Sequence, residues 1–471
     1  MRLKDLVDGG SDATITGFAI DHRKVAPGTI FGAFRGTRFN GEDYIAEAVK
    51  SGAVAVVARP EAKVEGALHI AADEPRRRFA GLAAKFFAPF PATTVAVTGT
   101  NGKTSTAELT RQLWRMAGHV AASIGTLGVT TADEQISTGL TTPDVVTFLS
   151  NMAGLAREGV THASFEASSH GLAQYRTEGL PVRAGAFTNL SRDHLDYHET
   201  MEAYLEAKLR LFSEVTDPDG AVVVWADDPA SERVTQAARS RGLRVLSVGT
   251  KGETLRLVSR TPNQLGQTLM IEVEGAQKKV ELPLIGAYQA ANALVAAGLV
   301  IATGGDAATT LGHLSRLVPV RGRLERAALT RAGAPIYVDY AHTPDAIRAA
   351  IEALRPHATH RLHIVLGAGG DRDKGKRPEM GKVATDLADV VYVTDDNPRS
   401  EDPATIRSEI MAAAPGATEI GDRRSAIAAA IAAAGAGDIV LIAGKGHEQG
   451  QIVGDRILPF DDVAVARECA A

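Results

Sequence analysis

The residues with the clearest chemical potential form one short stretch, Thr98-Gly99-Thr100-Asn101-Gly102-Lys103-Thr104, followed by Ser105. An apolar segment at 95–97 predicts a buried strand before it, and residues 104–116 predict a helix after it. Glycines at such a junction let backbone N–H groups face an anion, and the helix N-terminus adds partial positive charge. Lys103 can reach the outer phosphates of a nucleotide, and Thr104 can offer its hydroxyl to Mg²⁺. The stretch therefore predicts a phosphate-binding loop for ATP.

This loop is shorter than the general phosphate-binding pattern. That pattern has a glycine five residues before Gly102, where this chain has Val97. The alternative is a plain glycine turn between a strand and a helix. A plain turn does not require the Lys103–Thr104 pair, so we keep the nucleotide interpretation.

Length and composition indicate a multidomain enzyme rather than a nucleic-acid or membrane protein. A chain of 471 residues suggests about three domains. Its 51 Lys and Arg against 56 Asp and Glu give a net charge of −5, which provides no basic field for nucleic acid. The apolar stretch 427–443 is interrupted by glycines and Asp438, so it predicts a helix, a turn and a buried strand rather than a membrane span. With Cys469 as the only cysteine and no apolar leader, we expect a cytoplasmic protein.

The elements that must position the loop form three α/β segments. Short strands and helices alternate over residues 1–90, and Pro89 and Pro91 punctuate the chain before the loop. The second segment, 91–320, carries most of the chemically active residues, and the third, 321–471, repeats the strand-then-helix pattern. In open α/β sheets, ligands bind at the carboxyl ends of the strands. Residues that follow a strand are therefore the candidates to examine.

Several such residues lie in the second segment. Glu166 follows the predicted strand 163–165, and a carboxylate there could bind Mg²⁺ beside the loop, or could be a solvated loop residue. His194 follows a strand that ends near 190, although a single histidine is more often structural. Thr141 and Thr142 precede a predicted helix, where they could bind a ligand or cap the helix.

Lys208 is a special case. It lies on the apolar stripe of a predicted helix, with Tyr204, Leu205 and Phe212 at helical spacing. A buried ammonium is costly, so the residues alone favour a lysine that extends its amine into water.

Charged loops follow four predicted strands of the third segment. They are the stretches 339–345, 367–378, 395–399 and 444–448, the last of which follows a strand at 439–443. The glycine-rich loop 367–378 carries Arg and Lys between aspartates, which suits a carboxylated amino acid better than a nucleotide. An isolated Asp-Asn-Pro-Arg would usually be a turn. Four charged strand ends in order predict a second ligand site.

Several of these motifs together resemble the Mur ligase family. The resemblance rests on the T-G-T-N-G-K-T loop, the D-H-L-D-Y-H stretch at 193–198, Y-L-E-A-K-L-R-L-F at 204–212, and D-N-P-R at 396–399. It implies an α/β protein with an N-terminal UDP-binding domain (1–90), a central ATPase domain (91–320) and a C-terminal Rossmann-like domain (321–471). It also implies that Lys208 is carbamylated by CO₂ to N6-carboxylysine, which exchanges the buried cation for an anion.

The resemblance also assigns roles to individual residues. ATP is expected at Gly99, Thr100, Asn101, Gly102, Lys103, Thr104, Ser105, Asn292, Arg323, Asp339 and His342. Mg²⁺ is expected at Thr104, Glu166, His194 and carbamylated Lys208, with Lys103, Glu166, His194 and Lys208 as the catalytic set. The UDP-substrate is expected at His22, Arg23, Thr141, Thr142, Ser168, Gln174 and Arg176, and the amino acid at Arg372, Asp396, Asn397, Pro398, Arg399, Gly444 and Glu448. His22 stands where serine is usual in the family, and Trp225 where asparagine is usual.

The expected activity is ATP-dependent amide synthesis. The motifs of the third segment are similar to those of the family members that add meso-2,6-diaminopimelate to UDP-N-acetylmuramoyl-L-alanyl-D-glutamate through an acyl phosphate. We also expect a monomer. Three alternatives stay open: a ligase that adds L-lysine, a folylpolyglutamate synthetase, and a nucleotide switch without ligase chemistry.

Overall fold

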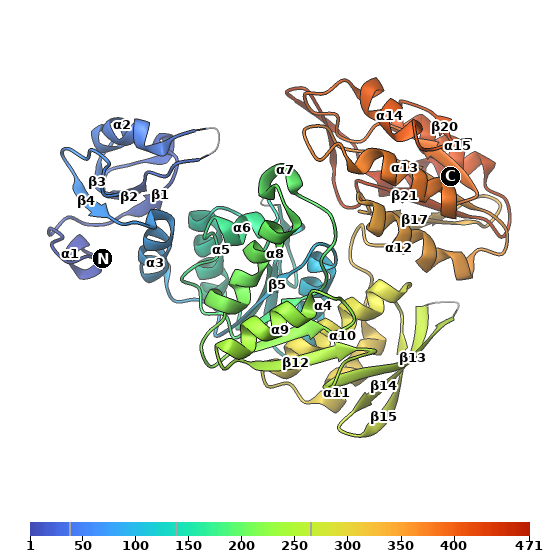
Figure 1. Cartoon of the computed structure of the whole chain (residues 1–471), viewed down its shortest axis with the longest axis horizontal. Coiled ribbons are helices and arrows are strands. Elements are labelled where there is room, and N and C mark those ends of the chain that lie inside the picture. The colour runs from blue at the N-terminus through green and yellow to red at the C-terminus, as the bar shows by residue number, and fades with distance from the viewer. Residues whose placement is uncertain (37–38, 138, 264–265) are drawn as a thin grey trace.

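The computed structural model describes residues 1–36, 39–137, 139–263 and 266–471. The chain forms three α/β units in sequence order, drawn blue, light blue through green to yellow, and orange to red in Figure 1. Each unit has its own sheet, and the third unit also carries a two-stranded hairpin.

The first unit is a four-stranded parallel sheet in the order β1-β2-β3-β4. Its elements are α1 (Leu3–Leu6), β1 (Gly17–Ala19), β2 (Thr29–Gly32), α2 (Ile45–Lys50), β3 (Ala53–Ala58), β4 (Leu68–Ala71) and α3 (Pro75–Phe87). Phe79 of α3 is fully buried, and its ring lies edge-on to Phe18 and Phe34 at centroid distances of 5.2 and 5.4 Å. α3 begins at Pro75, which fits the first helical position.

The second unit is built on an eleven-stranded sheet in the order β15-β14-β13-β12-β11-β10-β5-β9-β6-β7-β8. Parallel strands form its middle, and antiparallel strands extend both edges. The strands are β5 (Thr93–Thr98), β6 (Ala121–Gly125), β7 (Gly128–Thr130), β8 (Gln135–Ile136), β9 (His162–Glu166), β10 (Ala184–Phe187), β11 (Ala221–Trp225), β12 (Arg244–Gly249), β13 (Leu255–Asn263), β14 (Gly266–Val273) and β15 (Ala276–Leu282). The helices are α4 (Lys103–Met116), α5 (Val145–Arg157), α6 (Ser169–Ala173), α7 (Leu195–His198), α8 (Met201–Arg210), α9 (Ser231–Ser240), α10 (Ala287–Ala302) and α11 (Ala307–His313).

The third unit is a six-stranded sheet in the order β16-β17-β21-β18-β19-β20, in which β16 alone is antiparallel to its neighbour. Its strands are β16 (Glu325–Leu329), β17 (Pro335–Asp339), β18 (Leu362–Leu366), β19 (Val390–Val393), β20 (Thr418–Glu419) and β21 (Ile439–Ala443). The helices are α12 (Pro344–Leu354), α13 (Lys376–Leu387), α14 (Pro403–Met411), α15 (Arg423–Ala433) and α16 (Asp462–Ala470). A hairpin of β22 (Gly450–Val453) and β23 (Arg456–Pro459) lies beside the sheet.

Most expected elements agree with the structure. The expected strands at 95–97 and 163–165 lie within β5 and β9, and the apolar stretch 427–443 resolves into the end of α15, a turn and β21. No helix in the described ranges is long and apolar enough to cross a membrane. The helix that carries Lys208 ends before Phe212, which was expected on it. α8 stops at Arg210, and the chain goes on in one wider turn, Leu211–Val215. The Thr216 hydroxyl donates to Leu211 O at the end of this turn.

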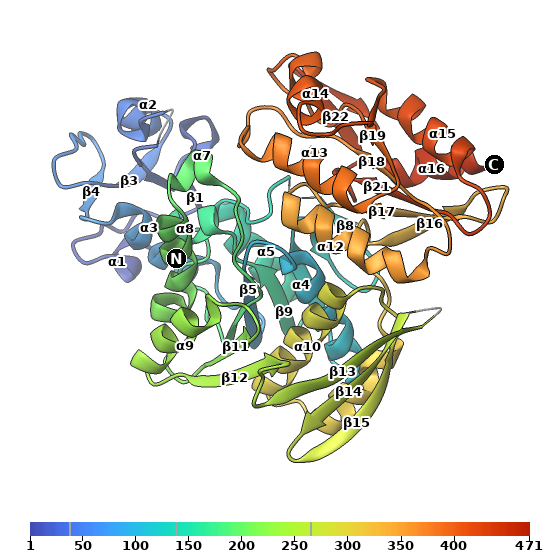
Figure 2. The same cartoon turned by 45° about the vertical axis from the view of Figure 1, so that its right-hand side comes forward.

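Ion pairs join the third unit to the second across their facing loops. The Arg192 guanidinium lies 3.3 Å from the Asp373 carboxylate and 3.6 Å from Glu379. Beside them, Asp193 lies 3.7 Å from the Lys376 ammonium. Figure 2 shows α12 and α13 of the third unit above α4 and α10 of the second. The phosphate-binding loop therefore faces the third unit.

One buried ion pair anchors the third unit, and it generates a stability prediction. Arg423 donates through Nε and Nη2 to the two carboxylate oxygens of Asp462 at 2.8 and 2.7 Å, and both side chains are fully buried. Arg423→Met should lower the free energy of unfolding by about 3–5 kcal/mol, because it leaves the Asp462 carboxylate buried without its partner. Native-state hydrogen exchange of the β18 and β21 amides in the full chain measures this loss.

The neighbouring Arg424 provides the matched control. It pairs with Glu468 at 2.6 Å, but both side chains are more than half exposed. Arg424→Met should therefore leave the free energy of unfolding nearly unchanged. Equal losses in the two variants would mean that burial of the Arg423–Asp462 pair does not matter.

Candidate active site

The phosphate-binding loop is a tight connection between β5 and α4 in which two positions accept only glycine. A Cβ at Gly99 would overlap Thr188 Oγ1, and a Cβ at Gly102 would overlap Asn292 Oδ1. Gly102 also has φ +85° at the N-cap of α4. Asn189, which follows β10, holds the loop from below: its Oδ1 accepts from Asn101 N and its backbone O accepts from Thr100 N, both at 2.9 Å.

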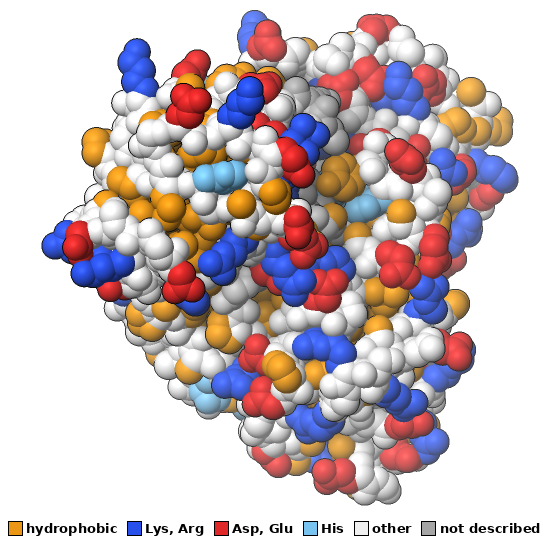
Figure 3. Space-filling view, turned by 60° about the vertical axis from the view of Figure 1, so that its left-hand side comes forward, with side chains coloured by type: hydrophobic (Ala, Val, Ile, Leu, Met, Phe, Trp, Pro, Cys, Tyr) orange, Lys and Arg blue, Asp and Glu red, His pale blue; other side chains and the backbone are white. Residues whose placement is uncertain are grey.

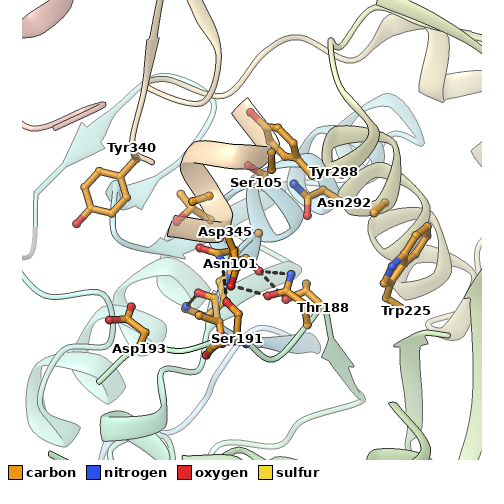
Figure 4. A pocket seen from close by; sticks show the side chains of 18 of the residues that line it. Asn101, Ser105, Thr188, Ser191, Asp193, Trp225, Tyr288, Asn292, Tyr340 and Asp345 are labelled. Carbon is orange, nitrogen blue, oxygen red and sulfur yellow. Dashed lines mark hydrogen bonds between the residues drawn. The ribbon is translucent and has the colours of Figure 1, made fainter. Parts of the chain in front are cut away.

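A cavity of about 680 Å³ opens over this loop. Among the residues expected at the nucleotide, those that line it are Thr100, Asn101, Gly102, Lys103, Thr104, Ser105, Asn292, Arg323, Asp339 and His342. Figure 4 shows Tyr340 and Asp193 on one side of Asn101 and Trp225 on the other. Trp225 therefore supplies an aromatic wall to this cavity. The volume falls within the range of small-molecule sites.

Two lysines converge on one carbonyl beneath the cavity. Lys103 Nζ donates to Gly99 O at 3.0 Å and to Thr100 O at 2.8 Å, and Lys208 Nζ donates to the same Gly99 O at 2.7 Å. Lys208 is 1% exposed and its ammonium lies 4.1 Å over the Tyr204 ring. The expectation that Lys208 extends into water is wrong, because the β5–α4 loop and Tyr204 enclose it.

Burial governs the protonation of both lysines. Loss of hydration, reinforced by the neighbouring Lys103 charge, holds the pKa of Lys208 well below its usual range. Burial also lowers the pKa of Lys103. A lowered pKa favours the neutral, nucleophilic form of the Lys208 amine more than in an exposed lysine.

Glu166 ends β9 and points into the cavity wall. It is 2% exposed, so it is not the solvated loop residue that its sequence position allowed. Its Oε1 accepts from Thr126 N at 2.7 Å and its Oε2 from Thr126 Oγ1 at 3.2 Å. Thr126 Oγ1 also lies 3.4 Å from Thr104 Oγ1. Thr126 therefore connects two of the four predicted Mg²⁺ ligands, Thr104 and Glu166, and only its position just after the β6 strand could have signalled it.

The donors around Thr104 fit a magnesium ion bound partly through substrate. Within the described residues, no cluster of three or more His, Cys, Asp or Glu is arranged to hold a metal. Mg²⁺ is commonly bound by one or two protein oxygens together with waters and substrate phosphates. The Thr104 hydroxyl and the Glu166 carboxylate supply such oxygens at the head of α4.

His194 and Asp193 form the part of the wall nearest the third unit. His194 has φ +55°, an unusual backbone for a residue other than glycine, and burial lowers its pKa so that the ring is neutral. Asp193 Oδ2 lies 3.6 Å from His194 Nε2 and 3.8 Å from His342 Nε2. Burial opposes ionisation of Asp193, but the Lys376 charge and the hydrogen bond from the His194 backbone N–H lower its pKa. Asp193 belongs to the D-H-L-D-Y-H stretch, but its spacing alone predicted no role for it.

Three of the residues expected at the nucleotide close the cavity from the third unit. Arg323 Nη2 donates to Thr104 Oγ1 at 3.0 Å, and its guanidinium lies 4.4 Å over the Tyr340 ring. Asp339 Oδ2 accepts from Leu324 N at 2.7 Å and from Tyr288 OH at 3.3 Å. His342 Nδ1 lies 2.8 Å from Tyr340 O. The cavity is consequently complete only when the two units are together.

The residues expected at the UDP-substrate fall into two separate groups. Thr142 is the centre of one group: its Oγ1 donates to Glu166 O at 2.8 Å and accepts from Ser168 N at 3.0 Å, and its backbone O accepts from Arg176 Nη1 at 2.8 Å. Gln174 joins through Arg176, and Thr141 through Thr126. His22 and Arg23 lie in the first unit, where His22 stacks on Tyr44 at 4.2 Å and Arg23 is bonded to Asp21.

The residues expected at the amino acid gather at the ends of β19 and β21. Asn397 Nδ2 donates to Glu448 Oε2 at 2.7 Å, Gly444 N donates to Asp339 O at 3.1 Å, and Asp396 is buried behind them. Arg399 follows Pro398 with φ +52° and donates from Nη1 to Gly370 O at 2.7 Å. Arg372 is exposed and donates to the adjacent Asp371 O. The structure thus gathers this set around Asn397, with Arg372 at its margin.

A phosphate-binding loop at the head of α4, in a chain of three α/β units, is typical of enzymes that bind a nucleotide. Three family models match the chain in order: the Mur ligase family catalytic domain at residues 14–87, the Mur ligase middle domain at 97–300, and the Mur ligase glutamate ligase domain at 322–446. The chain belongs to the Mur ligase family.

Several proteins of known name are similar in sequence to this chain over nearly its whole length. The chain is 62% identical to the UDP-N-acetylmuramoyl-L-alanyl-D-glutamate–2,6-diaminopimelate ligase of Zymomonas mobilis, over 97% of this chain and 95% of that protein. It is 52% identical to the ligase of the same name from Bradyrhizobium diazoefficiens, over 98% and 97% of the two chains. A solved structure of a ligase with that name covers 100% of this chain and 98% of its own, with a TM-score of 0.73 and 32% identity.

More distant structures share the fold. The MurF ligase of Thermotoga maritima in complex with ADP has a TM-score of 0.64 at 20% identity, and covers 98% of each chain. The structure is therefore the three-domain α/β architecture of the Mur ligases.

Proposed function

We propose that this protein is an ATP-dependent ligase that adds meso-2,6-diaminopimelate to UDP-N-acetylmuramoyl-L-alanyl-D-glutamate. The observation that carries the proposal is the 62% identity, over almost the full chain, to a ligase of that name. The cavity at the β5–α4 loop and the cluster around Asn397 give the chain a nucleotide site and a polar site on facing units.

The proposed reaction proceeds through an acyl phosphate. The D-glutamate side-chain carboxylate attacks the terminal phosphorus of ATP and ADP leaves; the amine of the amino acid then attacks the acyl carbon, and phosphate leaves as the amide forms. Such phosphoryl transfer depends on positioning and on neutralisation of charge. The loop N–H groups, Lys103 and Arg323 would bind the phosphates, Thr104 and Glu166 would hold Mg²⁺, and neutral His194 would face the same centre. Bound Mg²⁺ would supply further charge neutralisation there.

Lys208 is proposed to carry a carbamate. Its neutral amine can attack CO₂ to form an N–C bond and release one proton. The resulting anion relieves the conflict between two cations that share Gly99 O. The carbamate would offer an oxygen to Mg²⁺, in addition to the groups of Glu166 and His194.

Lys208→Ala should lower turnover by about 100-fold or more, as for loss of a charge-stabilising group. Added formate or acetate should restore part of the activity by occupying the vacated anion position. Lys251→Ala, at an exposed lysine of the same unit, should leave turnover unchanged. Steady-state ADP release measures all three, and full activity of Lys208→Ala would exclude a catalytic role for this residue.

Arg399 is proposed to select the amino acid. Meso-diaminopimelate and L-lysine differ by one distal carboxylate, and arginine can bind a carboxylate through two parallel hydrogen bonds. Nη1 of Arg399 is bonded to Gly370 O, and a guanidinium has five N–H donors in all.

Arg399→Ala should lose about 2–4 kcal/mol of transition-state binding for diaminopimelate, and much less for lysine. The expected difference arises because only diaminopimelate has a carboxylate to lose a partner. kcat/KM for both amino acids measures it. An equal fall for the two would mean that Arg399 only supports its loop.

A substrate panel tests the proposed function directly. Wild-type protein is given ATP, Mg²⁺ and UDP-N-acetylmuramoyl-L-alanyl-D-glutamate with meso-diaminopimelate, with L-lysine, or with no amino acid, and ADP release and product mass are followed. ADP release should require both co-substrates and should be fastest with meso-diaminopimelate. Rapid release without an amino acid would indicate a nucleotide switch, and preference for lysine would indicate the lysine-adding ligase.

We also propose the domain boundaries, the oligomeric state and the cellular location of the protein. We take 1–90, 91–320 and 321–471 as the three domains, and a monomer in the cytoplasm as the working form, since one chain supplies every group of the cavity. Neither a nucleic acid nor a membrane is proposed as a partner. On the face drawn in Figure 3, acidic and basic side chains are interspersed rather than gathered into a field of one sign.

A further inference from the structure

Lys445 is a buried cation to which the reaction above gives no role. It lies between Gly444 and Gly446, directly after β21, and its side chain is 0% exposed. Its Nζ donates to Gly450 O at 2.6 Å, to Asn397 Oδ1 at 3.1 Å and to Glu448 Oε2 at 3.1 Å. An ammonium has three N–H donors, so all of them are used within the protein. Lys445 is therefore held in one position and has no donor left for a ligand.

Two of these partners are the groups proposed to meet the amino acid. Asn397 Oδ1 accepts from Lys445 and from Ile452 N at 2.9 Å, which fixes the orientation of the amide and turns Nδ2 toward Glu448. Glu448 Oε2 accepts from both Asn397 Nδ2 and Lys445. In the described parts of the chain no hydrogen bond reaches Glu448 Oε1, and the side chain is 29% exposed. Oε1 is thus the oxygen that a ligand ammonium can reach.

We infer that Lys445 is a positioning residue that makes the pocket select an amino acid whose distal end carries both an ammonium and a carboxylate. The inference rests on the proposed function. Lys445 neutralises much of the Glu448 charge, so Glu448 can orient an ammonium but cannot compensate an added full positive charge. The distal end of diaminopimelate is neutral overall, because its ammonium and carboxylate cancel. The distal end of L-lysine brings one uncompensated positive charge near Lys445 and Arg399, which is unfavourable in a partly desolvated site.

The hairpin β22–β23 makes this arrangement rigid. Gly450 O and Ile452 N bind Lys445 and Asn397, Gln451 Nε2 donates to Asp396 O at 2.7 Å, and Arg399 N donates to Ile452 O at 3.0 Å. Lys445 therefore connects the loop after β19, the loop after β21 and the hairpin. Its removal would loosen the groups on which selection depends.

The test measures selectivity rather than activity alone. Wild type and Lys445→Met are each given ATP, Mg²⁺, the UDP-substrate and an equimolar mixture of meso-diaminopimelate and L-lysine, and the two products are quantified by mass spectrometry. The ratio of diaminopimelate product to lysine product should fall by about tenfold or more in Lys445→Met. KM for diaminopimelate should rise, while KM for ATP should stay unchanged. Lys382→Met, at a lysine of the same unit that is 66% exposed, should keep the wild-type ratio.

A second background separates selection from general support. Because Lys445 acts through the Glu448 carboxylate, Lys445→Met should produce no further fall in the ratio when Glu448→Gln is already present. An unchanged ratio in Lys445→Met, or an equal fall in both backgrounds, would overturn the inference. If Lys445→Met does not fold, Lys445→Gln replaces it, since glutamine keeps two N–H donors and removes only the charge.

Failure of this inference is distinguishable from failure of the proposed function. Wild type that makes no diaminopimelate product would overturn the proposed function, and the inference with it. Wild type that makes this product, together with a Lys445→Met ratio equal to that of wild type, would overturn the role of Lys445 alone.

Discussion

Two ammonium groups share one carbonyl oxygen in this protein, and much of the central unit depends on that arrangement. Lys103 and Lys208 both donate to Gly99 O beneath the cavity. Two positive charges at such separation repel strongly in a site that excludes water, so burial keeps at least one amine neutral or calls for an anion beside it. The loop, Tyr204 and the residues after β10 enclose this point. The site is therefore arranged for phosphate before any phosphate is bound.

The sequence predicted the parts of the site that are local. The β5–α4 loop was found because its chemistry lies in consecutive residues, and the strand-end rule located Glu166 and His194 because parallel strands end at one edge of a sheet. Lys208 could not be placed from its own helix. Periodicity shows which face a residue shares, but whether that face is covered depends on the loop after β5, more than one hundred positions away in the chain.

Residues missed by sequence reasoning share a different feature: each acts through another residue. Thr126 connects Thr104 to Glu166, and Asn189 holds Thr100 and Asn101. Their residue types are ordinary for loops, so nothing in their spacing distinguishes them. Lys445 is missed for a related reason, because a lysine between two glycines is typical of an exposed turn. Only the packing of the β22–β23 hairpin reveals its burial.

The split of the cavity across two units has a kinetic consequence. Arg323, Asp339 and His342 belong to the third unit and the loop to the second, so a nucleotide bound between them would lose half of its contacts as the units separate. Separation must also break the pairs Arg192–Asp373 and Asp193–Lys376, of which the first is partly open to solvent. Domain opening would then limit the rate of product release. The rate of such a step falls as solvent viscosity rises. It increases with ionic strength, because salt weakens the ion pairs between the units. Turnover would then depend on the viscosity and salt content of the solution as well as on the bond-forming steps.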